Sequence, residues 1–128
     1  MTASGSSPIV YIIDDDRDVR NSISFMLATD GIRSRTFASG QEFIDAWPGL
    51  SPGCLLLDVR MPRMTGLELL AALNEQECTW PVVVMTGHGE VDLGTRAIKL
   101  GARDFIEKPF DADLLLHCLR RALEAGKQ

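Results

Sequence analysis

Short apolar runs alternate with stretches of helical periodicity along the chain. The runs at 9–13, 54–57 and 82–85 contain almost only apolar side chains, which predicts strands that are buried on both faces. Residues 32–37 alternate apolar and polar side chains, which is typical of a strand with one exposed face, and Phe105-Ile106 indicates a short fifth strand. The pattern therefore predicts five strands spread over the chain.

Helical periodicity fills the segments that follow these runs. Val19, Ile23, Met26 and Leu27 fall on one face of a helix, and Gly31 is expected to mark its end. Two helices are expected to begin at capping boxes, in which a hydroxyl accepts from a free amide and a Glu reaches back. The further expected elements are a short helix opened by Ser39-Gly40-Gln41-Glu42 and ending near Trp47, a loop at 48–53, a helix opened by Thr65-Gly66-Leu67-Glu68, a helix over about 90–100, and a last helix over about 113–125 with Asp111 as its cap.

Strands that alternate with helices in this way predict an α/β fold with a parallel sheet. Right-handed crossovers put helices on both faces of such a sheet, which agrees with the nearly solid apolar strands. We expect one domain over residues 9–124, preceded by a flexible Ser/Gly-rich leader at 1–8 and followed by the start of a linker at 125–128.

Composition narrows the class of protein further. The chain has 128 residues, 45% of them apolar, so it can fill one core and is neither disordered nor fibrous. Its net charge of −5 argues against a nucleic-acid surface on this domain. No apolar run approaches the roughly 20 residues that span a bilayer, and a soluble cytoplasmic protein is expected. Cys54, Cys78 and Cys118 have no metal-like spacing and are expected to be small buried hydrophobic side chains.

Residues that can carry chemistry gather where the expected strands end. The first strand is followed by Asp14-Asp15-Asp16, the third ends on Asp58, the fourth ends at Thr86, and the fifth is followed by Lys108-Pro109. Ligands of an open parallel sheet bind beyond the carboxyl ends of its strands. Clustered carboxylates repel one another unless a cation neutralises them, and Mg²⁺ suits hard oxygen ligands with room for water. Such a site can bind a phosphoryl donor, whose phosphorus is attacked by one carboxylate while Lys108 and Thr86 contact its oxygens.

Each of these residues also has a simpler interpretation. The acidic triplet could cap the first helix, Asp58 could be a structural residue at a strand end, Thr86 could be a turn residue, and Lys108 could be a solvated surface charge. Their convergence on the same edge of one sheet favours the functional interpretation.

Four motifs together resemble the response regulator receiver family. They are Ile13-Asp14-Asp15-Asp16, Leu57-Asp58-Val59-Arg60-Met61-Pro62 with Gly66, Met85-Thr86-Gly87-His88-Gly89, and Asp104-Phe105-Ile106-Glu107-Lys108-Pro109-Phe110. The resemblance covers about residues 9–123, and the last two motifs are most similar to the FixJ-type subgroup. It implies a flavodoxin-like, doubly wound (βα)5 sandwich with a five-stranded parallel sheet in the order 2-1-3-4-5.

The resemblance also implies roles at the matching positions. Asp58 would be the phosphoacceptor. It would also hold Mg²⁺ together with Asp14, Asp15 and the backbone carbonyl of Arg60, with Asp15 favoured over Asp14 as a direct ligand. Lys108 would pair first with the acceptor carboxylate and then with the phosphoryl group.

Further positions are implied to switch or to shape the site. The hydroxyl of Thr86 would move towards the phosphate, and Phe105 would rotate inward from an exposed position without the hydroxyl that a Tyr would offer there. The Lys108-Pro109 bond is expected to be cis. Asp16 either caps the first helix, which we favour, or contacts the metal through water. Gly94 is either a tolerated surface glycine or a soft point of a signalling helix.

The function implied by the resemblance is a phosphorylation switch that assists its own phosphorylation and dephosphorylation and is not an enzyme. A histidine kinase would supply the phosphoryl group. The face formed by the fourth helix, fifth strand and fifth helix would control homodimerisation and output, which would be transcription through a DNA-binding domain absent from this chain, without membrane contact. The alternative is a stand-alone receiver that acts through protein–protein contacts. A phosphatase of the haloacid-dehalogenase kind would need a general acid where Arg60 stands, and a flavodoxin-like cofactor protein would need a phosphate cradle where the acidic triplet stands.

Overall fold

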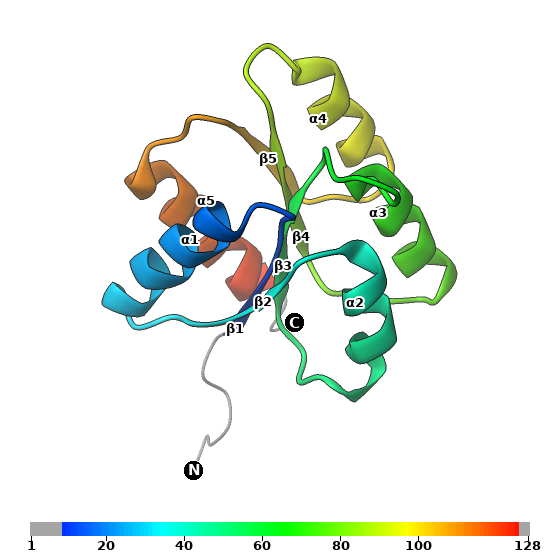
Figure 1. Cartoon of the computed structure of the whole chain (residues 1–128), viewed down its shortest axis with the longest axis horizontal. Helices are drawn as coiled ribbons and strands as arrows, with labels where there is room; N and C mark the ends of the chain where they lie inside the picture. Colours follow the sequence, from blue (N-terminus) through cyan, green and yellow to red (C-terminus); the bar gives the residue numbers. More distant parts are fainter. Residues whose placement is uncertain (1–8, 126–128) are drawn as a thin grey trace.

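The apolar runs of the sequence form the strands of one parallel sheet, which helices cover on both sides (Figure 1). The computed structural model describes residues 9–125, so the expected leader at 1–8 and residues 126–128 of the expected linker lie outside the described residues. The elements are β1 (Ile9–Ile13), α1 (Arg17–Thr29), β2 (Arg33–Phe37), α2 (Gly40–Ala46), a 3₁₀ turn η1 (Trp47–Gly49), β3 (Cys54–Asp58), α3 (Gly66–Glu75), β4 (Val82–Thr86), α4 (Val91–Lys99), β5 (Asp104–Glu107) and α5 (Ala112–Ala125).

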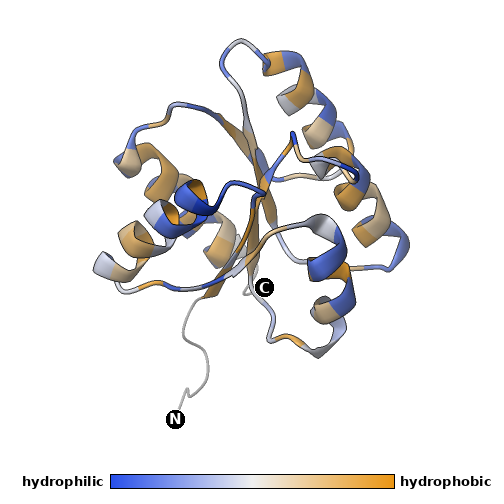
Figure 2. Cartoon of the chain, in the orientation of Figure 1, coloured by the Kyte–Doolittle hydropathy of each residue, from blue (hydrophilic) through white to orange (hydrophobic). Residues whose placement is uncertain are grey.

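Strand pairing confirms the expected doubly wound topology. Neighbouring strands run parallel in the order β2-β1-β3-β4-β5. Helices α1 and α5 cover one face of the sheet, and α2, α3 and α4 cover the other (Figure 1). The alternation of side chains along a strand supplies both cores, because Val10 and Ile12 pack in one buried cluster and Tyr11 and Ile13 in the other. Figure 2 shows the corresponding apolar colour concentrated along the strands and on the inner sides of the helices.

This double covering fixes the position of the strand ends. The central strands β3 and β4 are buried along their whole length, and each large apolar side chain buried there stabilises the fold by roughly 1.5–3 kcal/mol. Because both strands are held on two faces, the residues at their carboxyl ends have little freedom to move. The sheet is therefore a rigid base for any site built at that edge.

Side-chain caps begin four of the helices at the predicted residues, and at α5 the Asp111 carboxylate accepts from the Asp113 amide at 3.0 Å. The carboxylate of Asp16 accepts from two amides in the first turn of α1, at 2.9 and 3.3 Å, which supports its expected role as a cap. The capping box that begins α3 has both of its hydrogen bonds: the Thr65 hydroxyl accepts from the Glu68 amide, and the Glu68 carboxylate accepts from the Thr65 amide. At α2, the Ser39 hydroxyl accepts from the amide of Glu42 at 3.1 Å, but the Glu42 carboxylate accepts from Ala38 at 3.2 Å. The prediction of a reciprocal box at α2 is therefore wrong in its second half.

Element boundaries differ from the predictions by a residue or two. Strand β2 begins at Arg33, and Ile32 lies before it as a buried residue. Gly31 has a φ of 76°, a left-handed conformation that costs glycine little, and this lets the chain leave α1 and turn at once into β2. The predicted loop at 48–53 begins inside the short turn Trp47–Gly49, where Pro48 is the second residue and lacks an amide that the first turn would leave unpaired.

Two expectations drawn from composition can be compared with the structure. All three cysteines are free, but only Cys54 is fully buried, and burial raises the pKa of its thiol to about 12. Cys78 and Cys118 are partly exposed, so the prediction of small buried hydrophobic side chains is wrong for these two. Within residues 9–125, no helix has both the length and the apolar character needed to cross a bilayer.

Candidate functional site

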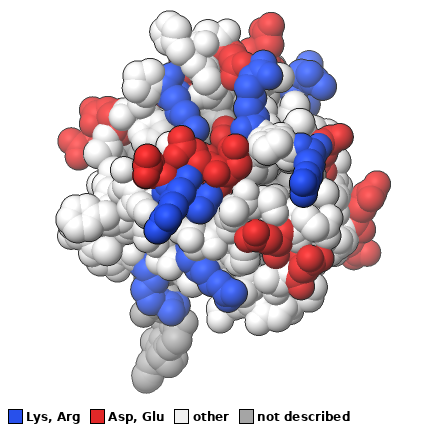
Figure 3. Space-filling model, in the orientation of Figure 1, with Lys and Arg blue, Asp and Glu red and all other residues white. Residues whose placement is uncertain are grey.

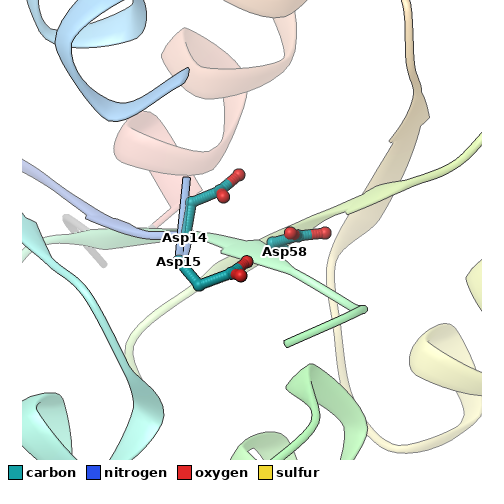
Figure 4. A group of neighbouring side chains, drawn as sticks. All are labelled: Asp14, Asp15 and Asp58. Atoms are coloured by element: carbon teal, nitrogen blue, oxygen red, sulfur yellow. The ribbon is translucent and has the colours of Figure 1, made fainter. Parts of the chain in front are cut away.

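Three carboxylates meet at the carboxyl end of the sheet. Asp14 and Asp15 follow β1, and Asp58 ends the adjacent strand β3, whose Leu57 is in register with Ile13. Figure 4 shows Asp14 and Asp15 side by side, with Asp58 across from them. One oxygen from each of the three lies within 4.8 Å of the others, so together they form the acidic cluster. Asp14 is fully buried, Asp58 is 8% exposed, and Asp15 is open to solvent.

Lys108 lies between two members of the acidic cluster. Its Nζ is 3.2 Å from Oδ2 of Asp14 and 3.7 Å from Oδ2 of Asp58. The bond between Lys108 and Pro109 is cis, as the resemblance implies. The ammonium is thus paired more closely with Asp14, which is fully buried, than with the predicted acceptor. Lys108 stays within reach of both.

The environment of Asp58 works against its ionised form. Burial raises the pKa of the Asp58 carboxyl to about 6, and the neighbouring Asp14 carboxylate adds to the rise. The Lys108 ammonium and the Arg60 amide, which donates to Oδ1 of Asp58 at 3.2 Å, oppose it. Repulsion within the acidic cluster is therefore only partly neutralised by the protein itself.

Thr86 ends β4 on the strand next to Asp58. Its side chain is fully buried, and its hydroxyl Oγ1 finds no hydrogen-bond partner within residues 9–125. An unpaired buried hydroxyl costs roughly 1–3 kcal/mol. Asp58 is in register with Met85, so the residue after Met85 stands at the same edge as the acidic cluster. A polar group arriving at that edge could satisfy the hydroxyl.

Gly94 and Phe105 contact each other, which sequence reasoning did not foresee. Gly94 is buried in α4, so the interpretation as a surface glycine is wrong. A Cβ at this position would lie 2.5 Å from Cγ and 2.6 Å from Cε2 of the Phe105 ring. The ring therefore lies against the bare backbone of α4. Phe105 is partly buried, which corrects the expectation of an exposed aromatic.

A second ionic contact joins the two loops that flank the site. Nε of Arg60, two residues after Asp58, donates to Oε2 of Glu90, which lies directly before α4. The other carboxylate oxygen of Glu90 accepts from the Gly87 amide at 2.9 Å. The Arg60 side chain and the Gly87 amide together hold the pKa of Glu90 below its usual value. Sequence reasoning missed this contact because the two residues are 30 positions apart and no local pattern or motif links them.

The sequence analysis gave Arg60 a role only through its backbone carbonyl. The structure places Arg60 at the start of the loop after β3, with its amide on Asp58. Whether its carbonyl is a metal ligand stays a prediction. Figure 3 shows acidic side chains gathered in a patch with Lys and Arg side chains beside it, and the side in view has no continuous basic surface.

Comparison with known proteins shows the family of a chain with this fold and site. The sequence profile of the response regulator receiver domain matches residues 10–120. The chain therefore belongs to the response regulator receiver domain family. Its relatives include the transcriptional regulatory protein FixJ of Bradyrhizobium diazoefficiens, which is 46% identical over 99% of this chain and 60% of that protein. FixJ of Rhizobium meliloti is 41% identical over 90% of this chain and 56% of its own length.

Solved structures of similar proteins have the same fold as this chain. Full-length FixJ from B. japonicum superposes with a TM-score of 0.89 at 44% identity, over 93% of this chain and 59% of that one. The FixJ-N structure gives a TM-score of 0.88 at 40% identity and covers 91% of this chain and 94% of that one. The chain thus spans about 60% or less of the curated FixJ proteins that it resembles, and nearly the whole of FixJ-N.

Proposed function

We propose that this receiver domain is a phosphorylation switch in which Asp58 accepts a phosphoryl group from a histidine kinase. A carboxylate oxygen of Asp58 forms the new bond to phosphorus. The bond from phosphorus to the histidine nitrogen of the kinase breaks, and the imidazole leaves with that electron pair. The observation that carries the proposal is the arrangement at one sheet edge, where Asp58 lies 3.7 Å from the Lys108 ammonium and near the Thr86 hydroxyl, which has no partner among residues 9–125.

The acidic cluster and the backbone carbonyl of Arg60 would hold Mg²⁺ in this proposal. The donor set fits the ion, since the carboxylate oxygens lie within 4.8 Å of one another and Mg²⁺ takes a few carboxylates plus water. Repulsion from Asp14 and Asp15 contributes to the raised pKa of Asp58, and a cation would relieve it. When bound, Mg²⁺ neutralises charge on the oxygens of the transferring group. Lys108 would follow the negative charge from the carboxylate to the phosphoryl group.

The switch in this proposal consists of Thr86 and Phe105. The Thr86 hydroxyl turns towards a phosphoryl oxygen, which gives it the partner it lacks within residues 9–125. The space it leaves lies beneath α4, and the Phe105 ring moves further under the helix to fill it. Because that ring already lies against the backbone of Gly94, its movement reaches α4 directly.

The proposed output surface is the α4 side of the molecule. Val91 and Ile98 are 49% and 40% exposed, and together with Thr95 they form a stripe at helical spacing on α4. Exposed apolar side chains of this kind suit a homodimer that forms when α4 and β5 move. Lys99 borders the stripe one turn after Thr95. We therefore place the phosphorylation-dependent dimer contact on this face, with α5 beside it.

We take residues 9–124 as the receiver domain, and what its dimer controls depends on the other domains of the whole protein. The named relatives are transcriptional regulators of greater length, which supports transcriptional output through a DNA-binding domain outside this chain, in the cytoplasm. A stand-alone receiver acting through protein contacts is the alternative. The native residues after Gln128 would decide between them, because a basic helix-turn-helix pattern there indicates DNA binding.

An enzymatic role is less well supported by the same site. A phosphatase of the haloacid-dehalogenase kind needs a general acid two residues after the nucleophile. Arg60 holds that position, its guanidinium pairs with Glu90, and a guanidinium keeps its proton in proteins. A flavin phosphate would meet the carboxylates of Asp14 and Asp15 instead of a cradle of amides.

Intact-mass measurement tests the proposed acceptor. After incubation with acetyl phosphate and Mg²⁺, the parent chain should gain a single phosphoryl group, and Asp58→Asn should gain none. The matched Asp45→Asn variant removes an exposed carboxylate on α2 and should be phosphorylated like the parent. An adduct on Asp58→Asn at the level of the parent would overturn the assignment.

Sedimentation tests the proposed dimer surface. The parent should be mostly monomeric alone and should associate when beryllofluoride and Mg²⁺ are added. Charge reversal at Lys99 combined with a bulky residue at Thr95 should abolish the increase in mass. Association that survives this double change, or an unchanged mass over a wide concentration range, would remove the proposed surface.

A further inference from the structure

Glu90 connects the two loops that border the acidic cluster. Its Oε2 accepts from Nε of Arg60, in the loop after β3, and its Oε1 accepts from the Gly87 amide, in the loop after β4, at 2.9 Å. The Glu90 side chain is 21% exposed, whereas that of Arg60 is 71% exposed, so the carboxylate is the more buried partner of this ion pair. One anionic side chain thus engages a cation from the Asp58 loop and an amide from the Thr86 loop.

The amide that Glu90 occupies has a particular position. Gly87 directly follows Thr86, whose hydroxyl has no partner within the described part of the chain. Of the two neighbouring donors at the end of β4, one is therefore unpaired and the other is engaged by a carboxylate. Glycine at position 87 leaves room for this contact, because a Cβ there would lie 2.7 Å from Oε1 of Glu90 and would displace the carboxylate. The local sequence is thus compatible with an anion at the Gly87 amide.

We infer that the Glu90 carboxylate is a place-holder for the phosphoryl group: it occupies the Gly87 amide and Arg60 while Asp58 is unmodified, and phosphorylated Asp58 displaces it. This inference rests on the proposed function of Asp58. A phosphoryl group carries more negative charge than a carboxylate and offers three acceptor oxygens. It therefore competes well for an amide and a guanidinium that already bind an anion.

Displacement of Glu90 has a consequence for α4. Glu90 is the N-cap residue of α4, yet its side chain makes no capping hydrogen bond to the helix. Once released from Gly87 and Arg60, the carboxylate stands beside the amides of the first turn, where a negative charge is stabilising. The exchange would carry the modification of Asp58 to the start of the helix that bears the proposed output surface, by a route separate from Thr86 and Phe105.

A simpler role for the contact predicts a different pattern of mutant effects. If the Arg60–Glu90 pair only ties two loops together, then breaking it from either side should have the same effect on anion binding. If Glu90 is a place-holder, removing Glu90 and removing Arg60 should change the affinity for the anion in opposite directions. Loss of Glu90 frees two anion-binding groups, whereas loss of Arg60 leaves Glu90 on the Gly87 amide with its charge unpaired.

The test is the affinity for beryllofluoride at saturating Mg²⁺, measured by calorimetry on the whole chain. Glu90→Ala should bind about two- to five-fold more tightly than the parent, the range expected when an exposed ionic contact no longer competes. Glu90→Gln keeps one acceptor for the Gly87 amide, so its affinity should lie between those of the parent and Glu90→Ala. Arg60→Gln should bind more weakly than the parent.

Glu107→Gln is the matched control. The Glu107 carboxylate accepts from the Gly89 amide at 2.5 Å, in the same loop, so the variant removes one negative charge without freeing Gly87. It should bind within about two-fold of the parent, and urea unfolding of every variant checks that the fold is retained. Equal affinity changes in Glu90→Ala and Arg60→Gln, or a gain in Glu107→Gln as large as in Glu90→Ala, would overturn the place-holder. Failure of the parent to bind beryllofluoride would instead overturn the proposed function.

Discussion

Replacing Asp58 by Asn should stabilise the unphosphorylated fold, and should do so only where the carboxylate is ionised. Burial and the Asp14 carboxylate raise the pKa of Asp58 to about 6, against an ordinary value of 3.8. Each pH unit of difference corresponds to about 1.4 kcal/mol between the protonation states. The ionised carboxylate of Asp58 therefore costs the folded chain as much as ~3 kcal/mol, which the neutral amide of Asn avoids.

The pH window of this effect follows from the direction of the pKa change. Folded Asp58 keeps its proton to a higher pH than the unfolded chain does. The contribution of Asp58 to the free energy of unfolding therefore falls as pH rises from about 4 to about 6, and it stays low above that range. Asp58→Asn lacks this loss. Its advantage over the parent should be near zero at pH 4, should grow through the window, and should be constant above about pH 7.

Urea unfolding followed by tryptophan fluorescence measures this advantage. Trp47 and Trp80 pack edge to face, 5.6 Å apart, and separate on unfolding. The measurements are made with a chelator present, and Mg²⁺ added at pH 7 should reduce the advantage of the variant. Asp45→Asn is the control, since its carboxylate is exposed beside the neutral Gln41. If Asp58→Asn differs from the parent by the same amount at pH 4 and pH 7, the account of the acidic cluster is wrong.

Three further changes have outcomes set by single contacts. Gly94→Ala should destabilise the fold by about 1–2 kcal/mol in urea unfolding, because overpacking against Phe105 outweighs the better helix propensity of Ala; a variant more stable than the parent would contradict the contact. Asp15→Ala should weaken calorimetric Mg²⁺ binding more than Asp16→Ala, whose main effect should be loss of the cap; equal weakening would remove the distinction. Thr65→Ala should cost about 1 kcal/mol of unfolding free energy through loss of the box that opens α3, and an unchanged urea midpoint would argue against that box.

The fold could be predicted from the sequence because its signals are local. A run such as Cys54–Leu57 has no polar face, so it fits only a strand covered on both sides. The strand ends follow from the same runs, and this was enough to bring Asp14, Asp15 and Asp58 to one edge. The strand order came from the resemblance rather than from the residues.

The features that were missed depend on contacts between distant segments. Nothing near Gly94 in the sequence reveals that the Phe105 ring lies against it, so neither interpretation of Gly94, as a surface glycine or as a soft point of the helix, includes this contact. The Glu90 contact joins two loops through long side chains whose direction no periodicity sets. The Glu42 carboxylate accepts from the amide of Ala38 instead of that of Ser39, and a capping pattern does not distinguish these two neighbouring amides.

Chemical trapping of the modified residue tests the central claim most directly. The chain is incubated with acetyl phosphate and Mg²⁺, reduced with sodium borohydride, which converts an aspartyl phosphate to homoserine, and sequenced by tandem mass spectrometry. The account predicts homoserine at position 58 and at no other aspartate, including the neighbouring Asp14 and Asp15. Homoserine at either of those positions, or unmodified Asp58 in a chain that has gained a phosphoryl group, would contradict it.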